Sequence, residues 1–270
     1  MKISCIQMNV RAAAPERNFT RAEELIRRAA REKPDVIVLP ETWNTGFAPA
    51  TIDPARADED GARTKALCSA LAKELGVNLV AGSVTIRKPG GLSNTAYVFD
   101  RAGGCIAEYD KTHLFSPAGE AQAYVPGKSP ASFMLDGARC GLMICYDIRF
   151  PELARSLALP GLDLLFVVAE WPKERITQLG VLLKARAIEN QVFAVLANGC
   201  GTADGVRFGG RSTIVSPLGE TLAAAREGEA IIGAALDPGD AKRVRAAIPV
   251  WNDRRPELYG ALCQTDERLE

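Results

Sequence analysis

The chain has 270 residues, of which 47% are hydrophobic and 24% are charged, an ordinary composition for a globular protein with a deep core. Lysine plus arginine equals aspartate plus glutamate at 33 each, so no basic excess favours a nucleic acid or an anionic membrane as the partner. This balance of charged residues favours a reaction on a small molecule. One domain spanning residues 1–270 is the simplest organisation.

Strand-like and helix-like segments alternate along the chain, which indicates an α/β fold. The first half predicts a strand at 3–8, a helix near 17–31, a strand at 35–39, a helix at about 64–75 and a strand at 77–84. The second half predicts a strand at 140–145, a helix from 151 to about 159, a strand at 164–169, a helix at about 178–190 and a strand at 191–197. Hairpins are expected at 93–110 and 211–225. We expect helices to cover both outer faces of two stacked sheets.

The N-terminal sequence, MKISCIQMNV, predicts a short buried strand and lacks the basic and long apolar regions of a secretory leader. No run approaches the roughly 18 apolar residues that are needed to span a bilayer. The chain has seven cysteines and no C-x-x-C motif. These features favour reduced thiols in the cytoplasm over a disulfide framework or a zinc site.

The sequence lacks residue types and motifs that several kinds of site require. His113 is the only histidine, so a multi-histidine metal centre is impossible and any histidine-based triad must use this residue. Neither G-x-x-x-x-G-K-[ST] nor G-x-G-x-x-G after a strand occurs, so the sequence predicts no loop that binds nucleotide phosphates. We therefore expect a reaction that uses no metal and no cofactor.

Cys145 stands at the end of an apolar strand and is followed by Tyr-Asp-Ile-Arg-Phe-Pro-Glu, which predicts a sharp bend into a helix. Such a bend exposes the thiol at the sheet edge, offers the backbone N–H of Tyr146 to an oxyanion, and directs the positive end of the helix dipole at a thiolate. Most cysteines are instead small buried hydrophobes, which is what we expect of Cys140, facing the opposite way on the same strand.

Glu41 and Lys111 also follow predicted strands. Alone, each is typical of a solvated charge at a strand end. Together with Cys145 they supply a proton carrier, a positive charge and a nucleophile, which is all that thiol-based amide cleavage requires without histidine. A Cys–His hydrolase that uses Cys145 and His113 is an alternative.

These residues resemble the nitrilase superfamily of carbon–nitrogen hydrolases. The matching blocks are Leu-Pro-Glu at 39–41, Tyr-Asp-Lys-Thr-His-Leu-Phe at 109–115 and Cys-Tyr-Asp-Ile-Arg-Phe-Pro-Glu at 145–152, and the likeness continues through 184–191 and 254–259. The resemblance implies an α-β-β-α sandwich that forms a homodimer or a higher even-numbered oligomer.

The resemblance also implies a role for each matching residue. Cys145 would be the nucleophile, Glu41 the general base and acid, and Lys111 the electrostatic partner of the oxyanion. Glu120, in a loop rich in glycine and proline, would orient Lys111 and help to position the substrate. We expect Asp147, Arg149 and Glu152 to form a structural polar cluster behind the nucleophile.

The segment Glu-Trp-Pro-Lys-Glu-Arg at 170–175 resembles bacterial ω-amidases, which act on 2-oxoglutaramate and related monoamides of dicarboxylates. Trp171 and Arg175 would then bind substrate, with Arg175 on the far carboxylate, although an exposed loop arginine fits the sequence equally well. Those relatives usually carry His-Trp where this chain has Gln178 and Leu179, which predicts an altered pocket.

Other functions use the same Glu-Lys-Cys set and differ mainly in the pocket. A deaminated-glutathione amidase, an N-carbamoyl hydrolase and a nitrilase are alternatives within the superfamily. A catalytically silent metabolite-binding scaffold is the alternative from another class.

Overall fold

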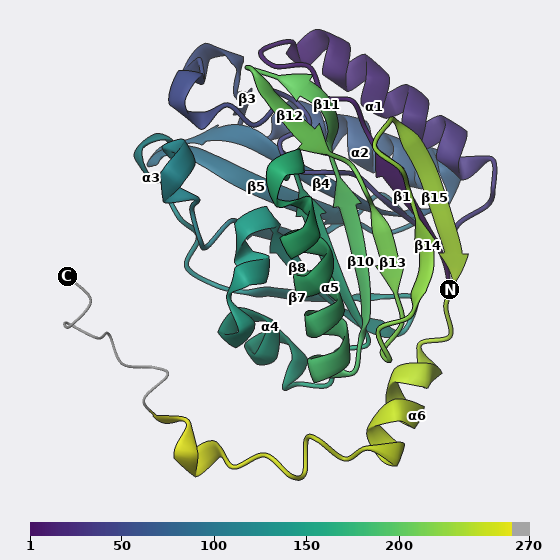
Figure 1. The fold of residues 1–270 in the computed structure, drawn as a ribbon. Helices are drawn as coiled ribbons and strands as arrows, with labels where there is room; N and C mark the ends of the chain where they lie inside the picture. Colours follow the sequence, from purple (N-terminus) through teal and green to yellow (C-terminus); the bar gives the residue numbers. More distant parts are fainter. Residues whose placement is uncertain (261–270) are drawn as a thin grey trace.

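Residues 1–260, the part of the chain that the computed structural model describes, form two large mixed β-sheets packed face to face between layers of helices (Figure 1). The first sheet has the order β15 (Ala230–Ala235), β1 (Lys2–Gln7), β2 (Val36–Val38), β4 (Asn78–Lys88), β5 (Gly91–Phe99) and β6 (Cys105–Asp110), with β3 (Asp58–Glu59) paired to β4. The second has the order β14 (Thr221–Ala224), β13 (Thr213–Val215), β10 (Phe193–Asn198), β9 (Leu164–Ala169), β8 (Ala138–Ile144) and β7 (Ala131–Leu135). A separate hairpin joins β11 (Cys200–Ala203) to β12 (Val206–Gly209).

Helices cover the outer face of each sheet, so the expected α-β-β-α sandwich is confirmed. The first sheet carries α1 (Pro15–Ala30) and α2 (Ala62–Leu75), and the second carries α4 (Pro151–Ala158) and α5 (Ile176–Asn190). Proline at the start of α1 and α4 and left-handed Gly76 after α2 set the boundaries. Both predicted hairpins form, as β5–β6 and β13–β14. No helix within residues 1–260 is long and apolar enough to cross a membrane.

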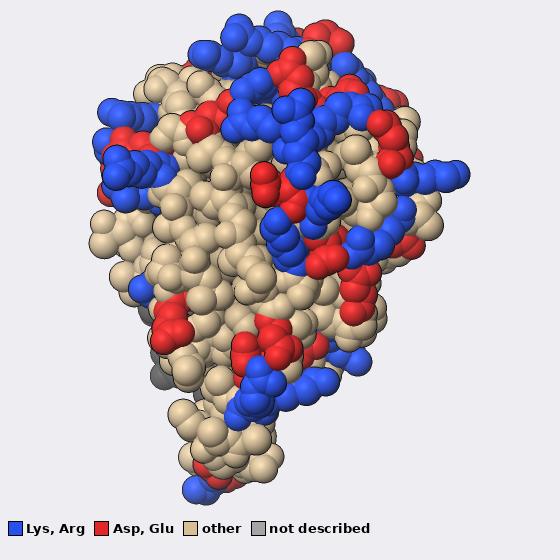
Figure 2. All heavy atoms as spheres, turned by 90° about the vertical axis from the view of Figure 1, so that its right-hand side faces the viewer, with Lys and Arg blue, Asp and Glu red and all other residues tan. Residues whose placement is uncertain are grey.

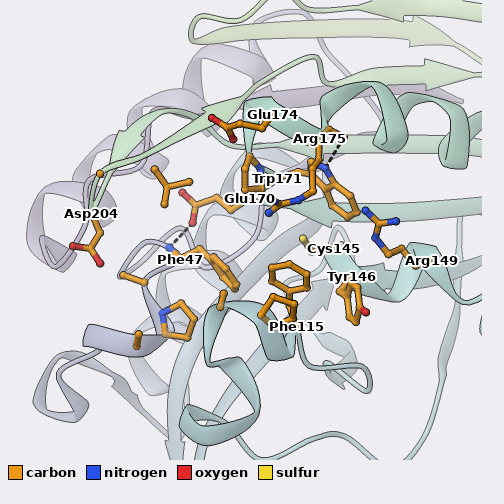
Figure 3. Close-up of a pocket in the computed structure, with 18 residues that line it drawn as sticks. Phe47, Phe115, Cys145, Tyr146, Arg149, Glu170, Trp171, Glu174, Arg175 and Asp204 are labelled. Carbon is orange, nitrogen blue, oxygen red and sulfur yellow. Dashed lines mark hydrogen bonds between the residues drawn. The ribbon is translucent and has the colours of Figure 1, made fainter. Parts of the chain in front are cut away.

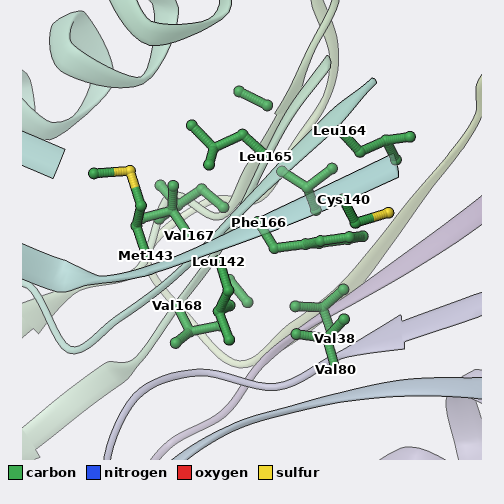
Figure 4. Packing of buried hydrophobic residues seen from close by; sticks show 14 of the residues in the cluster. Val38, Val80, Cys140, Leu142, Met143, Leu164, Leu165, Phe166, Val167 and Val168 are labelled. Atoms are coloured by element: carbon green, nitrogen blue, oxygen red, sulfur yellow. The ribbon is translucent and has the colours of Figure 1, made fainter. Parts of the chain in front are cut away.

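The main core lies between the two sheets and follows the alternation of side chains along each strand. On β9, Phe166 and Val168 point toward Val38 and Val80 of the first sheet, whereas Val167 points to the opposite face (Figure 4). A second core fills the space between the first sheet and its helices. Because β9 is buried on both faces, its sequence is apolar throughout.

Charged side chains of both signs are interspersed on the face at the right of Figure 1 (Figure 2). On α1, for example, Arg27 Nη1 lies 2.6 Å from Glu74 Oε1, and Arg21 Nη1 lies 2.6 Å from Glu24 Oε2. Exposed pairs of this kind contribute only about 0–1 kcal/mol each. The stability of the fold therefore depends mainly on the two cores.

Two short elements complete the chain path near the sheets. The turn α3 (Glu120–Ala123) follows the first sheet, and α6 (Gly239–Ala247) follows β15. After α6, the chain runs beneath α4 in Figure 1, where the guanidinium carbon of Arg155 lies 4.8 Å from the centre of the Trp251 ring. The segment that follows α6 is thus in contact with α4 through Trp251.

The strand directions bring several strand ends to one edge of the sandwich. In the first sheet β1, β2 and β4 are parallel, and β6 runs in the same direction because β5 is antiparallel to both its neighbours. In the second sheet β8, β9 and β10 are parallel. The amide N–H of Glu41, just after β2, donates to the Ala169 carbonyl at the end of β9 over 3.5 Å. The carboxyl ends of the two sheets therefore meet, which is where α/β proteins place their sites.

A bulge in β4 holds the segment after β2 in position. Gly82 has φ +64°, and the register of β4 shifts at this point. Ser83 then donates its N–H to the Pro40 carbonyl over 3.1 Å, and its Oγ accepts the N–H of Thr42 over 3.1 Å. A Cβ atom on Gly82 would lie 2.0 Å from the Pro40 oxygen, so only glycine permits this approach.

We predict that Gly82→Ala destabilises the protein by at least about 2 kcal/mol more than Gly76→Ala, because overpacking is added to backbone strain. Gly76 is a matched control, since its φ is also +64° but a Cβ atom there would meet nothing within 4 Å. Urea unfolding of the two variants measures the difference. Equal losses of stability would mean that the close approach to Pro40 is unimportant.

Candidate active site

The candidate catalytic residues gather at the joined strand ends. Glu41 follows β2, Lys111 follows β6, and Cys145 follows β8. Glu120 lies at the start of α3, directly after Gly119 in a left-handed conformation. The side chains of Glu41, Lys111 and Glu120 are fully buried and linked by hydrogen bonds, and their charges act on Cys145. Residues predicted from separate parts of the sequence are thus brought together.

Glu41 is held by donors on both carboxylate oxygens. Its Oε1 accepts hydrogen bonds from Lys111 Nζ at 2.9 Å and Asn94 Nδ2 at 2.8 Å, and its Oε2 accepts the backbone N–H of Glu170 at 2.8 Å. These donors come from three different strand regions, so the carboxylate orientation is fixed by the fold. These hydrogen bonds compensate for the removal of the carboxylate from water.

Lys111 is shared between two carboxylates. Its Nζ lies 2.8 Å from each oxygen of Glu120, in addition to its contact with Glu41. Burial acts to lower the pKa of Lys111, but the charges of Glu41 and Glu120 outweigh it and raise this pKa well above the ordinary value. Burial raises the pKa of Glu120, although Lys111 opposes the shift. The ammonium group therefore stays charged inside the protein.

Cys145 adopts an uncommon backbone conformation at the end of β8. Its φ is +48°, and it begins a 3-10 turn, η4 (Cys145–Arg149), rather than an α-helix. Asp147 supports this turn, because its Oδ2 accepts the N–H of Ile144 over 2.9 Å and the hydroxyl of Tyr109 over 2.7 Å. A non-glycine residue in this conformation costs about 1–2 kcal/mol and is typical of a functional bend.

The surroundings of Cys145 favour its neutral thiol. A thiolate facing a helix N-terminus would have a lowered pKa. Instead, burial and the neighbouring carboxylate of Glu41 raise the pKa of the Cys145 thiol well above its ordinary value, with Lys111 only partly opposing them. The expected helix dipole does not act here, because a 3-10 turn rather than a helix follows the thiol directly. The resting site holds a neutral thiol.

A cavity of about 540 Å³ opens onto Cys145 (Figure 3). Its wall combines aromatic and charged side chains, chiefly Phe47, Phe115, Tyr146, Arg149, Trp171 and Arg175. The guanidinium carbon of Arg175 lies 5.3 Å from the centre of the Phe115 ring, and that of Arg149 lies 5.0 Å from the centre of the Trp171 ring. The indole N–H of Trp171 donates to the Arg175 carbonyl over 2.8 Å. The cavity is therefore of a size for a small molecule, and its wall carries the cations Arg149 and Arg175 together with the carboxyl groups of Glu170, Glu174 and Asp204.

The two positions that differ from ω-amidases lie outside the cavity wall. Gln178 is exposed and Leu179 is fully buried in the main core, so neither borders the cavity. The helical spacing of α5 turns Leu179 toward the second sheet and Gln178 toward solvent. The expected difference from ω-amidases at these positions therefore does not alter the cavity wall directly.

The three polar residues after Cys145 do not form the expected cluster. Asp147 is buried beneath the 3-10 turn, Arg149 at the end of that turn faces the cavity, and Glu152 is exposed in the first turn of α4. His113 lies 2.9 Å from Asp147 through Nδ1, stacks on Phe150, and is not part of the cavity wall. This placement argues against a Cys–His pair.

Sequence reasoning missed Glu170 and Asn94. Glu170 is fully buried directly after β9 and borders the cavity, so the strand-end argument used for Glu41 could have found it. Asn94 lies within β5 and donates to Glu41, but an asparagine inside a strand carries no comparable signal. No group of three or more His, Cys, Asp or Glu side chains arranged to hold a metal ion occurs within residues 1–260.

Comparison with known proteins identifies close relatives of this architecture. A family model described as carbon-nitrogen hydrolase matches residues 2–246. The 2-oxoglutaramate amidase of Bacillus subtilis is 41% identical over 257 residues, which cover 95% of this chain and 98% of the relative. A superfamily protein of Xanthomonas campestris with an arsenic adduct in its active site has a TM-score of 0.88 at 30% identity, covering 94% of this chain and 97% of its own. An amidase from Nesterenkonia sp. that has added acrylamide at its active-site cysteine has a TM-score of 0.82 at 27% identity. The match covers 96% of this chain and 98% of the amidase chain.

We predict that Lys111→Met lowers the free energy of unfolding by about 3–5 kcal/mol at pH 8, because it leaves two buried carboxylates without their cation. The loss should shrink toward pH 5, where protonation of the carboxylates relieves the repulsion. Urea unfolding at the two pH values measures both effects.

Lys88 provides a matched control, since its Nζ also bridges two carboxylates, Glu108 and Asp110, but its side chain is 24% exposed. Lys88→Met should cost no more than about 1 kcal/mol. Similar losses for the two variants would contradict the account of the buried cluster.

Proposed function

The chain belongs to the carbon–nitrogen hydrolase family and is an amidase, and we propose that it is an ω-amidase acting on 2-oxoglutaramate or a related monoamide of a short dicarboxylic acid. The position of Arg175 is the observation that supports this substrate class. Its guanidinium borders the same cavity as Cys145 and packs over the Phe115 ring, rather than pairing with a carboxylate of residues 1–260. The Bacillus subtilis relative, a 2-oxoglutaramate amidase, supports the same substrate class.

In the proposed mechanism, Glu41 accepts the proton of Cys145 while the sulfur attacks the amide carbon. Because the resting thiol is neutral, proton transfer accompanies the attack. The ammonium group of Lys111 and the backbone N–H of Tyr146 stabilise the oxyanion, and each such donor contributes about 3–4 kcal/mol in the transition state. Glu120 holds Lys111 in place through both its oxygens.

Glu41 then returns its proton to the amide nitrogen, the C–N bond breaks, and ammonia leaves a thioester on Cys145. A water molecule attacks the thioester, with Glu41 accepting a proton from it. The C–S bond breaks, the carboxylic acid is released, and Glu41 gives the proton back to the sulfur. The same carboxyl group thus serves both half-reactions, and the cycle needs no cofactor.

The other amidases, the N-carbamoyl hydrolases and the nitrilases would use the same Glu41, Lys111 and Cys145. The two guanidinium groups at a space of about 540 Å³ support an acid-bearing amide over a nitrile or a large peptide-like amide, and they lie among the carboxyl groups of Glu174 and Asp204 on the same wall. Ammonia release from 2-oxoglutaramate, 2-oxosuccinamate, deaminated glutathione, carbamoylated amines and simple nitriles separates these functions. A silent scaffold would release no ammonia from any of them.

We extend the proposal to the assembly and location of the enzyme. Val181 and Ile188 are 64% and 51% exposed and lie seven residues apart on the outer side of α5, which supports a homodimer or a higher even-numbered oligomer built on this face. The six cysteines within residues 1–260 are free thiols, which supports the cytoplasm as the location, while Cys263 lies outside the described residues.

We predict that Cys145→Ala abolishes ammonia release and leaves the fold intact, because the thiol contributes little to packing. Rapid quench of the wild type with substrate should give an acyl adduct by intact-mass measurement. Cys140→Ala is the matched control, since Cys140 is a buried cysteine of β8 whose thiol donates to the Ala138 carbonyl. An active Cys145→Ala enzyme without an adduct in the wild type would refute the covalent mechanism.

We predict that Arg175→Lys lowers kcat/KM for 2-oxoglutaramate by about tenfold to a hundredfold, the effect of losing a charge-assisted hydrogen bond of about 1.5–3 kcal/mol. Lysine cannot reproduce the two parallel hydrogen bonds of a guanidinium. An uncharged amide of similar length should be affected little, so the ratio of the two kcat/KM values is the measurement. Arg149→Lys tests the other cation of the cavity, and an unchanged ratio in Arg175→Lys would remove Arg175 from carboxylate recognition.

A further inference from the structure

Glu170 is a buried carboxyl group of the cavity wall that the mechanism does not use. Its Oε2 accepts a hydrogen bond from the Phe47 N–H at 2.6 Å (Figure 3) and a second one from Thr42 Oγ1 at 2.8 Å. Its Oε1 is buried and has no partner within residues 1–260. A Cβ atom on Gly199 would lie 2.6 Å from Glu170 Cγ, so glycine at this position leaves room for the carboxyl group. An unpartnered polar atom at a cavity wall indicates a ligand group that completes its hydrogen bonding.

The two donors on Oε2 determine where a proton can sit. Oε2 behaves as the carbonyl oxygen of a neutral carboxyl group, which leaves Oε1 as the hydroxyl oxygen. Burial raises the pKa of Glu170 to about 8, with Glu41 adding to the shift and the bonds from Thr42 and Phe47 opposing it. The neutral form therefore predominates at pH 7, and the group ionises as the pH rises through about 8.

The other ionisable groups around Glu170 come from every element that borders this part of the site. They are Glu41 after β2, Lys111 after β6, Glu120 of α3, Cys145 and Arg149 of η4, Glu174 and Arg175 of η5 (Lys173–Arg175), Cys200 of β11, and Asp204 in the turn after it. Burial raises the pKa of Cys200 to about 12, so this thiol stays neutral through the same range. Glu41, Lys111, Glu120 and Cys145 belong to the chemical steps, which all amide substrates share.

We propose that neutral Glu170 is a specificity-determining residue, which donates a hydrogen bond from Oε1 to the far carboxylate of an acidic amide and rejects that substrate when ionised. The proposal rests on the preference for acidic amides proposed above. A hydroxyl donor to a carboxylate forms a short, strong hydrogen bond, whereas two carboxylates in a buried cavity repel each other. Neutral Glu170 and Arg175 together would supply a donor and a positive charge to the same end of the substrate.

The test uses two amides of equal length, glutaramate and pentanamide, which differ in the far carboxylate. The ratio of their kcat/KM values is measured from pH 7 to pH 9, because ionisation in the chemical steps affects both substrates and cancels. In the wild type the ratio should fall about tenfold over this range, as expected for a required proton with a pKa near 8. In Glu170→Gln the ratio should stay constant and close to the wild-type value at pH 7.

Glutamine is a close mimic of the neutral acid here, because its carbonyl oxygen can accept from Thr42 and Phe47 while its amide group donates from the position of Oε1. A purely structural role for Glu170 would not make the ratio depend on pH. A pH-independent ratio in the wild type, the same fall in Glu170→Gln, or a folded Glu170→Gln enzyme inactive on both amides would each overturn the inference about Glu170. A wild type with no preference for glutaramate at pH 7 would overturn the proposed function, and the inference with it.

Discussion

The site is organised by the ammonium group of Lys111, which is buried between the carboxylates of Glu41 and Glu120. Removing three charged groups from water is costly, and only their mutual contacts at 2.8–2.9 Å offset that cost. The cluster therefore requires the ends of β2 and β6 and the start of α3 to keep fixed positions. In return, it places a positive charge and a carboxylate beside Cys145.

The sandwich keeps these positions fixed through the directions of its strands and through the positive φ angles of Gly82 and Cys145. Parallel strands bring Glu41, Lys111, Cys145 and Glu170 to one edge, from both sheets. The bulge at Gly82 then binds the segment that carries Glu41, and the left-handed conformation of Cys145 turns its thiol toward that segment. Gly82 and Cys145 thus both lie near the edge where the carboxyl ends of the two sheets meet.

The sequence predicted the α/β alternation, both hairpins and the strand-end positions of Glu41, Lys111 and Cys145, because these depend on local periodicity and on where apolar runs stop. It could not predict the neutral thiol, which depends on burial beside a carboxylate from the other sheet. It also could not place Gln178 and Leu179 relative to the cavity, since which face of α5 meets the second sheet is decided by packing. Asn94 was missed for the same reason: its role arises from a contact made across 53 residues.

The neutral states of Cys145 and Glu170 follow from one electrostatic constraint. Glu41, Glu120 and Lys111 already leave the buried cluster with an excess of negative charge, so each additional anion beside it is disfavoured. Burial and Glu41 accordingly raise the pKa of both Cys145 and Glu170. In the proposed mechanism the thiol proton moves to Glu41 only as the sulfur forms its bond to carbon, so the number of buried negative charges does not increase. The new negative charge develops on the substrate oxygen, next to the ammonium group of Lys111 that the two carboxylates hold in place.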